Sequence, residues 1–200
     1  VTGPNEYENN INNNWYTNRL ATWTMDWTME VIKLMEEEFP EKLKTTLQKV
    51  GFDAVKETKN WQDIVHNMHF PFYKEKQVFL QQEGFLDKEL RNAADLNPAE
   101  RPINQHWSWD RILRSVFIKQ ADVLQCFFFF ENKFSTKELE KHFDFYEPIT
   151  VHESSLSPCV HVILAAKIKR LDKALELYLR TSRLDLDDYN HEADEGLHIT

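Results

Sequence analysis

Apolar residues recur along most of the chain at intervals of three or four positions, which is the spacing of an α-helix with one buried face. The longest such stretch runs from about residue 12 to residue 38 and carries Trp15, Leu20, Trp23, Trp27, Val31, Leu34 and Met35 at this spacing. The pattern predicts further helices over about 41–50, 61–68, 108–130, 135–144, 158–168 and 170–184. A succession of helices joined by loops is typical of a helical bundle or an α/α barrel.

Helix-boundary residues accompany several of these patterns. Gly51 follows the second predicted helix, at a position where a left-handed residue commonly ends a helix. Asn60 is expected to cap the helix over 61–68, because its side chain can accept a backbone N–H of the first turn. Ser157 is expected to do the same for the helix that starts near Pro158.

The stretch from residue 69 to residue 86 departs from the helical pattern. Pro71 and Gly84 interrupt it, and its aromatic residues favour extended chain. Val78-Phe79-Leu80 is a candidate strand, and we expect it to form a small hairpin with Phe85-Leu86. Residues 87–106 hold few large apolar residues and are predicted to be a loop.

The composition narrows the classes of protein that this chain can represent. Its 24 Lys and Arg residues stand against 33 Asp and Glu residues, a formal charge of −9. Binding to nucleic acid or to an anionic membrane surface requires a basic face, so neither partner is expected. Hydrophobic residues make up 42% of the 200 positions, enough for a packed core. Only four residues are glycine, which favours helices over sandwiches, barrels and nucleotide-binding α/β folds.

Cysteine usage and the chain ends bear on the origin of the sequence. Cys126 and Cys159 are too few for a disulfide scaffold and suit a reducing compartment, so a cytoplasmic location is expected. No apolar run approaches the roughly 20 residues that cross a bilayer, and no signal-peptide pattern is present. Val1 and Thr200 adjoin dense polar and aromatic segments rather than linkers, so we expect a piece of a longer protein.

The first polar and aromatic segment, VTGPNEYENNINNNWYTN, combines residue types that suit a sugar site. Seven positions between Asn5 and Asn18 are Asn, whose amides can pair with vicinal hydroxyls. Aromatic rings can stack on pyranose faces, and Glu6 can serve as a general acid where a dry site raises the pKa of its carboxyl. The alternative is an Asn-rich polar linker.

The second segment, IKQADVLQCFFFF, places Lys119 and Asp122 three positions apart, so a helix would put both on one face. Lys119 and Gln120 would then lie at the rim of a buried helix, where they can meet a ligand. The alternative is a surface ion pair of little energetic weight. The rest of the segment, with its run Phe127–Phe130, is expected to be core.

The third segment, TVHESSLSPCVH, carries the adjacent hydroxyls of Ser154 and Ser155 just before a predicted helix. Hydroxyls and the free N–H groups of a helix N-terminus can together bind an anion. His152 and His161 are nine positions apart, which matches no one-turn ligand motif. They are therefore expected to be structural residues rather than a metal pair.

The fourth segment, RLDLDDYNHEADEGLHIT, holds three aspartates without the Gly and closing Glu of a twelve-residue calcium loop. Helix capping or hydrogen bonding within a loop is the expected role of these carboxylates, and no metal site is predicted. His198, which follows Gly196 and Leu197, is a candidate phosphate donor.

The chain resembles the inverting disaccharide phosphorylases of glycoside hydrolase family 65 in four strings that occur in the same order: VTGPNEYENNINNNWYTN, IKQADVLQ, YEPITVHESSLSPCVH and RLDLDDYN–EGLHIT. Asn5 and the stretch HWSWDRILRSVFIKQADVLQ look most like the members that act on maltose. The resemblance implies an all-α fold, an α/α six-hairpin barrel (toroid), with a small β-hairpin insertion. Residues 1–200 would be the C-terminal part of this catalytic barrel.

The resemblance also implies parts that lie outside this sequence. These are an N-terminal β-sandwich and the first half of the barrel, including a Trp-Glu pair of the sugar pocket. We therefore expect residues 1–200 to hold an incomplete site that is inactive by itself. Members of the family tend to dimerise, so a homodimeric parent enzyme is expected.

The same resemblance implies roles for six residues. Glu6 matches the general acid, Lys119 and Gln120 match a substrate-binding pair, and the region that holds phosphate is matched by Ser154, Ser155 and His198. The implied reaction is inverting phosphorolysis, in which maltose and phosphate give β-glucose 1-phosphate and glucose. Its partners are the disaccharide and inorganic phosphate, and neither a metal nor an organic cofactor is expected.

Three alternatives stay open at this point. Trehalose, kojibiose or trehalose phosphate can replace maltose within the same family. An inverting hydrolase would need a second carboxylate, Glu8 or Glu153, as a base that activates water. A non-catalytic, carbohydrate-binding helical module would bind sugar without turnover and without dependence on phosphate.

Overall fold

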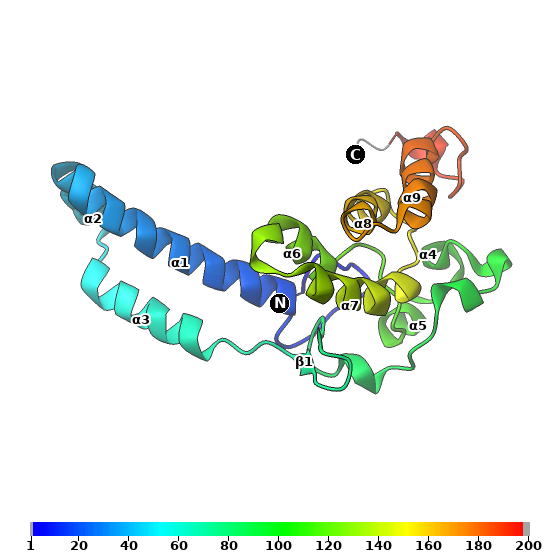
Figure 1. Ribbon diagram of the computed structural model, residues 1–200, viewed down its shortest axis with the longest axis horizontal. Helices are drawn as coiled ribbons and strands as arrows, with labels where there is room; N and C mark the ends of the chain where they lie inside the picture. The colour runs from blue at the N-terminus through cyan, green and yellow to red at the C-terminus, as the bar shows by residue number, and fades with distance from the viewer. Residues whose placement is uncertain (1, 198–200) are drawn as a thin grey trace. The chain divides into compact units, whose positions relative to one another are not determined.

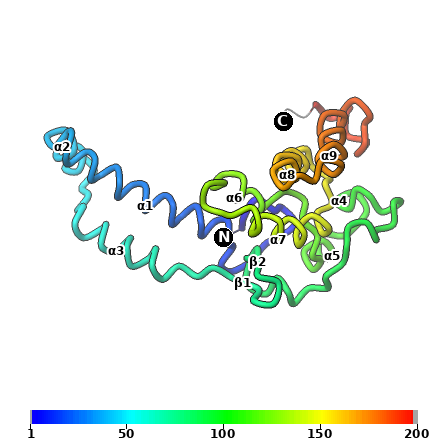
Figure 2. Tube along the Cα trace, viewed as in Figure 1, coloured from blue at the N-terminus to red at the C-terminus, as the bar shows by residue number. Residues whose placement is uncertain are grey.

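The computed structural model describes residues 2–197 and is dominated by helices (Figures 1 and 2). The chain divides into two compact units, one formed by residues 17–70 and the other by residues 1–16 together with 71–200. Within the described residues, the strands form one two-stranded sheet. None of the helices in this part of the chain combines the length and the apolar character that crossing a membrane would require.

The smaller unit is built from the helices α1 (Trp15–Glu38), α2 (Pro40–Val50) and α3 (Ala54–Asn67). Gly51 ends α2 in the left-handed conformation (φ 64°), as predicted. The prediction that Asn60 caps a helix over 61–68 is wrong, because α3 begins seven residues earlier. Asp53 caps this helix instead, since its carboxylate accepts the backbone N–H of Lys56 at 3.0 Å.

The second segment of the larger unit, residues 71–200, begins with a short hairpin. Strands β1 (Phe72–Tyr73) and β2 (Val78–Phe79) pair antiparallel, with Phe72 opposite Phe79. The hairpin prediction is confirmed, but its expected partner Phe85-Leu86 is wrong. Phe85 is fully buried in a 3-10 turn instead, directly after Gly84 reverses the chain in the left-handed conformation (φ 71°).

The predicted helix over 108–130 is two helices, α5 (Trp109–Arg114) and α6 (Val123–Phe129), preceded by the short α4 (Ile103–His106). The residues between α5 and α6 are not helical, and the run from Val116 to Ile118 is buried there. Ile118 forms a parallel bridge with Thr150 there. Lys119 and Asp122 therefore share no helix face, contrary to prediction.

The remaining helices are α7 (Thr136–Tyr146), α8 (Leu156–Lys167) and α9 (Leu171–Arg183). Ser135 and Glu138 form a capping box at the start of α7. Helices α8 and α9 pack against each other as a hairpin (Figure 1). Since α8 begins at Leu156, Ser157 lies inside its first turn, and the prediction that it caps the helix is wrong.

Aromatic stacking forms much of the core of the larger unit. The ring of Trp15 lies 4.7 Å from that of Phe79, and the ring of Phe127 lies 4.1 Å from that of Phe134. The phenylalanine run is core only in part: Phe127 is 2% exposed, whereas Phe129 is 53% exposed. Short 3-10 turns connect the elements at Phe85–Asp87, Ala93–Asp95, Pro98–Glu100, Glu131–Lys133, Glu147–Ile149 and Ala193–Glu195.

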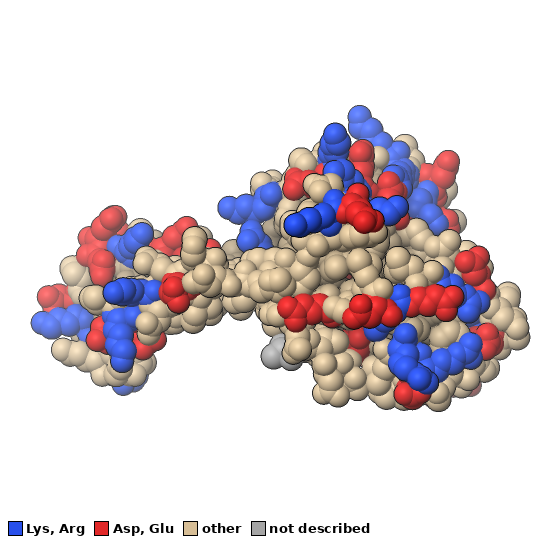
Figure 3. Space-filling model, turned by 90° about the horizontal axis from the view of Figure 1, so that it is seen from below, with Lys and Arg blue, Asp and Glu red and all other residues tan. Residues whose placement is uncertain are grey.

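Charged side chains of both signs lie beside one another on the face drawn in Figure 3. Several of the exposed charges of the protein are paired, for example Lys167 with Glu131 at 2.9 Å and Lys173 with Glu176 at 2.8 Å. Each exposed pair contributes little to stability, so packing of the apolar faces is what holds the helices together.

Candidate active site

Three segments that are distant in sequence converge in the larger unit. The N-terminal loop lies on the extended segment before α6, because Lys119 N–H donates to Asn5 Oδ1 at 3.0 Å and Glu6 N–H donates to Gln120 Oε1 at 3.1 Å. The bridge between Ile118 and Thr150 joins that segment to the loop before α8. The sequence-predicted residues Glu6, Lys119 and Gln120 are thereby brought together.

The first and third segments also meet directly. The hydroxyl of Tyr7 donates to Glu153 Oε2 at 3.3 Å. Tyr7 directly follows Glu6, and Glu153 directly precedes Ser154, so this contact joins the loop of the candidate acid to the loop of the two serines. The contact of Tyr7 with Glu153 was not predicted, because residues 146 positions apart leave no periodic signal in the sequence.

The carboxylate of Glu6 faces the ammonium of Lys119. Lys119 Nζ donates to Glu6 Oε2 at 2.8 Å, and 58% of the Glu6 side chain is exposed. The hydrogen bond from Lys119 lowers the pKa of Glu6, against a smaller opposing effect of burial. In this structure Glu6 is therefore a charged group that is paired with Lys119 at an accessible position.

The buried carboxylate of Asp122 holds the N-terminal loop through a hydrogen bond. Asp122 is 2% exposed and accepts the amide of Asn14 at 3.1 Å. Burial raises the pKa of Asp122 to about 7. Gly3 packs so closely that a Cβ there would lie 2.1 Å from Asp122 Oδ2, so a larger residue would have to displace the paired side chains of Asp122 and Asn14. Asp122 was expected to share a helix face with Lys119 or to form a surface ion pair with it, and its buried position was not predicted.

The two carboxylates that a hydrolase could use as a base are held in other contacts. Glu8 is 7% exposed and pairs with Lys88. Glu153 is 4% exposed, and its oxygens accept Arg101 Nε–H at 3.0 Å, Ile103 N–H at 2.9 Å and the Tyr7 hydroxyl. A general base needs access to the water that it activates, so both carboxylates fit structural roles better.

The predicted anion-binding hydroxyls lie at the start of α8. Ser154 is partly exposed, and its Oγ accepts the backbone N–H of Leu156 at 3.3 Å. Ser155 is 4% exposed and immediately precedes the first helical residue. The free N–H groups of the first helical turn make this end of α8 electropositive. His198, the third predicted phosphate residue, lies outside the described residues.

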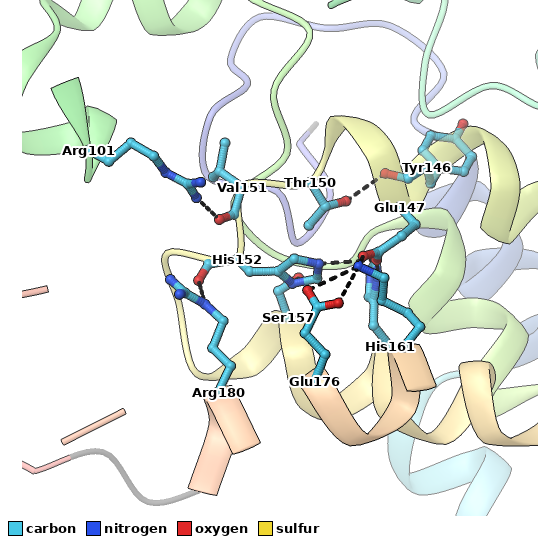
Figure 4. Close-up of polar contacts among 11 residues, drawn as sticks. Arg101, Tyr146, Glu147, Thr150, Val151, His152, Ser157, His161, Glu176 and Arg180 are labelled. Carbon is cyan, nitrogen blue, oxygen red and sulfur yellow. Dashed lines mark hydrogen bonds and ion pairs between the residues drawn. The ribbon is translucent and has the colours of Figure 1, made fainter. Parts of the chain in front are cut away.

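Glu147 joins the two histidines of the third segment, His152 and His161, in one cluster (Figure 4). His152 Nε2–H donates to Glu147 Oε2 at 3.1 Å, and His161 Nδ1–H donates to the same oxygen. Potential ligand atoms of the three residues lie within 4.8 Å of one another, a spacing compatible with a metal ion. However, Lys173 Nζ lies 3.6 Å from the other Glu147 oxygen, and its charge already balances the carboxylate.

The aspartates of the fourth segment make the local contacts expected of them. Asp187 pairs with Arg183 at 2.6 Å. Asp188 Oδ1 accepts the backbone N–H groups of Glu192 and Ala193, each at 3.0 Å. These carboxylates therefore serve to fold the loop that follows α9.

Comparisons with known proteins place the chain among carbohydrate enzymes. The central catalytic domain of glycosyl hydrolase family 65 matches residues 1–200. The chain is 54% identical over its full length to a maltose phosphorylase of Bacillus subtilis (strain 168), of which it covers 25%. It is 37% identical over 99% of its length to an alpha,alpha-trehalose phosphorylase of Thermoanaerobacter brockii, of which it covers 26%. The chain thus spans about a quarter of the length of these curated relatives.

A solved structure assigned as a kojibiose phosphorylase from the human microbiome has the same fold. It matches with a TM-score of 0.87 at 37% identity, over 99% of this chain and 27% of that one. The prediction of a mostly helical fold with a small hairpin, corresponding to part of an α/α barrel, is thereby confirmed.

Proposed function

This chain belongs to glycosyl hydrolase family 65, and we propose that the protein of which it forms part is an inverting disaccharide phosphorylase. The observation that carries the proposal is the contact set around Glu6. Its carboxylate meets Lys119 at 2.8 Å, its backbone N–H meets Gln120 at 3.1 Å, and its neighbour Tyr7 reaches the loop of the two serines. These contacts support a site in which Glu6 is the acid, Lys119 and Gln120 bind sugar, and the linked serine loop binds the anion.

In the proposed reaction, Glu6 transfers its proton to the glycosidic oxygen as the bond from that oxygen to C1 breaks. A phosphate oxygen attacks C1 from the opposite face, so the α-glucoside becomes β-glucose 1-phosphate and the second sugar leaves with the proton of Glu6. Phosphate is already an anionic nucleophile, so it needs to be held in line rather than deprotonated. The step therefore requires no metal or organic cofactor.

The phosphate is assigned to the hydroxyls of Ser154 and Ser155, to His198 and to the N–H groups at the start of α8. This assignment is supported by the position of the serines at an electropositive helix end and by the link from Glu153 to Tyr7. Lys119 and Gln120 are assigned to the hydroxyls of the glucose that is transferred. Glu8 and Glu153 are both held by cations, so neither fits the role of a hydrolytic base, which favours phosphorolysis over hydrolysis by these two carboxylates.

Glu6 has to be protonated in the complex, whereas its ion pair with Lys119 lowers its pKa in the free chain. We assign the change to the sugar itself. A sugar hydroxyl that accepts a hydrogen bond from the Lys119 ammonium weakens this ion pair. The Glu6 carboxyl is exposed in the free chain, and exclusion of water from it by the bound sugar disfavours its charged form. Both effects raise the pKa of Glu6 when substrate binds.

Maltose is the proposed disaccharide, because the Bacillus subtilis relative carries maltose in its name. Trehalose and kojibiose are the alternatives, since other similar relatives are phosphorylases of these sugars.

The test is an assay of the complete protein with maltose, trehalose and kojibiose, each with and without inorganic phosphate. We expect β-glucose 1-phosphate from maltose only when phosphate is present. Release of glucose without phosphate would replace the proposal by a hydrolase, and sugar binding without any turnover would replace it by a binding module. The chain of residues 1–200 alone is expected to be inactive, since it covers a quarter of its relatives.

A further inference from the structure

We propose that His152 is a positioning residue that holds Ser154 and Ser155 in place for phosphate. It does so through a hydrogen bond between its imidazole and Ser157, which closes the loop of residues 152–157. This inference rests on the function proposed above. His152 has no chemical step in this proposal, and its imidazole contacts Glu147 and Ser157 (Figure 4).

The hydrogen bond between His152 and Ser157 joins the two ends of the loop that contains Ser154 and Ser155. Ser157 Oγ–H donates to His152 Nδ1 at 3.1 Å, and Ser154 and Ser155 are among the four residues between them. Ser157 is fully buried in the first turn of α8, so it is a fixed anchor. A loop whose two ends are joined by a buried hydrogen bond has few conformations, and its hydroxyls are thereby pre-organised.

The other side of the same imidazole is held as well. His152 Nε2–H donates to Glu147 Oε2 at 3.1 Å, and both ring nitrogens of His152 therefore have a partner. This pattern fixes a neutral ring with its proton on Nε2, and burial favours that form by lowering the pKa of His152 to about 4. The imidazole thus connects the end of α7 to the start of α8 across the loop.

The backbone of His152 makes the turn that the loop needs. Its φ is 52°, in the left-handed region that a residue with a Cβ rarely adopts and that persists where surrounding contacts enforce it. Arg180 Nε–H donates to the carbonyl oxygen of His152 at 2.7 Å, which holds the turn from α9. This turn lies between Thr150, which forms the bridge to Ile118, and Glu153, which contacts Tyr7.

His161 provides a matched comparison. It donates to the same Glu147 oxygen and is fully buried, but it lies in the middle of α8 and not on the loop. A substitution of His161 by Leu therefore removes a similar hydrogen bond in the same cluster but leaves the hydrogen bond between His152 and Ser157 intact. A purely structural role predicts similar effects of His152→Leu and His161→Leu, whereas positioning predicts different effects.

The experiment measures phosphorolysis of maltose by the complete protein as phosphate and maltose are varied separately. We expect His152→Leu to raise the KM for phosphate about tenfold and Ser157→Ala about threefold, with the KM for maltose changed by less than about twofold. His161→Leu is expected to lower the Tm while leaving both KM values within about twofold of the original protein.

Each outcome decides the matter. Equal changes in the phosphate KM for His152→Leu and His161→Leu, or no change for Ser157→Ala, would overturn the positioning role. If His152→Leu does not fold, Ser157→Ala gives the answer, because it removes one hydroxyl and leaves the left-handed residue unchanged. Absence of phosphate-dependent turnover in the unsubstituted protein would overturn the proposed function, and the positioning role with it.

Discussion

The hydroxyl of Tyr7 donates a hydrogen bond to Oε2 of Glu153 at 3.3 Å, and this contact joins the loop of the candidate acid to the loop of the candidate phosphate site. Both residues are buried, with 1% and 4% of their surface exposed. Glu153 also binds Arg101 and the backbone of Ile103, so the carboxylate is a common anchor for three parts of the chain.

Removing the Tyr7 hydroxyl tests this anchor. We expect Tyr7→Phe to lower the free energy of unfolding by about 1–2 kcal/mol, because a buried hydrogen bond to a charged oxygen is lost while the ring packing stays. Denaturant unfolding monitored by circular dichroism measures the change. An exposed tyrosine such as Tyr178 is the control, and its change to Phe is expected to have no measurable effect. Equal stability of all three proteins would show that the contact is not formed in solution.

The assignment of the acid is tested by replacing two glutamates that are two positions apart. In the complete protein, Glu6→Gln is expected to reduce the phosphorolysis rate by about 10²–10⁴-fold, because the amide cannot donate the required proton. Glu8→Gln is expected to reduce stability by weakening the buried pair with Lys88, while the rate per folded molecule changes little. Near-normal turnover by Glu6→Gln would end the assignment.

The ion pair of Glu6 makes a prediction about pH. Glu6 must be protonated to act, so kcat/KM falls as the pH rises through its pKa in the free protein. Lys119 lowers this pKa, and Lys119→Met is expected to move the falling limb of the profile to higher pH, at a lower absolute rate. The measurement is kcat/KM against pH for both proteins. A limb that stays in place or moves to lower pH would contradict the pairing.

The buried Asp122 makes a prediction about stability. Burial raises its pKa from 3.8 to about 7, so between about pH 4 and pH 7 the folded protein keeps a proton that the unfolded chain has released. The contribution of this group to the free energy of unfolding is fully present below about pH 4 and is lost as the pH rises to about 7. Asp122→Asn keeps an acceptor for Asn14 but has no titrating group.

The stability advantage of Asp122→Asn over the unsubstituted protein should therefore grow from about pH 4 to about pH 7, by no more than about 4 kcal/mol, and then level off. Denaturant unfolding at several pH values measures this difference, from which the titration of other groups cancels. A difference that is constant with pH would show that the Asp122 carboxyl titrates normally in the folded protein.

The sequence predicted those features that local pattern and motif determine. Helix α2 and its end at Gly51 follow from periodicity and from a residue that tolerates positive φ, and Glu6, Lys119 and Gln120 follow from motif resemblance. The extended segment around Ile118 was predicted as helix because its neighbours continue a helical apolar spacing. Pairing with Thr150, more than thirty positions away, overrides that local preference.

The cluster that Glu147 forms with His152 and His161, two histidines expected to be structural, was not predicted, for a related reason. Its members have no helical spacing, and a left-handed turn at His152 brings them together. The anchors Tyr7 and Asp122 were missed because their partners, Glu153 and Asn14, come from other parts of the chain. Sequence reasoning thus found the groups proposed to touch substrate but not those that hold them.

The convergence of the three loops also has a consequence for folding. The contacts of Glu6 and Tyr7 close chain segments of 114 and 146 residues. Closing loops of this length carries a large entropic cost, so such contacts form late, after the helical hairpins whose contacts are local. A nascent or partly folded chain therefore acquires its helices before the groups proposed as acid, sugar-binding and anion-binding residues come together. Catalytic competence is expected to appear only with the last step of folding.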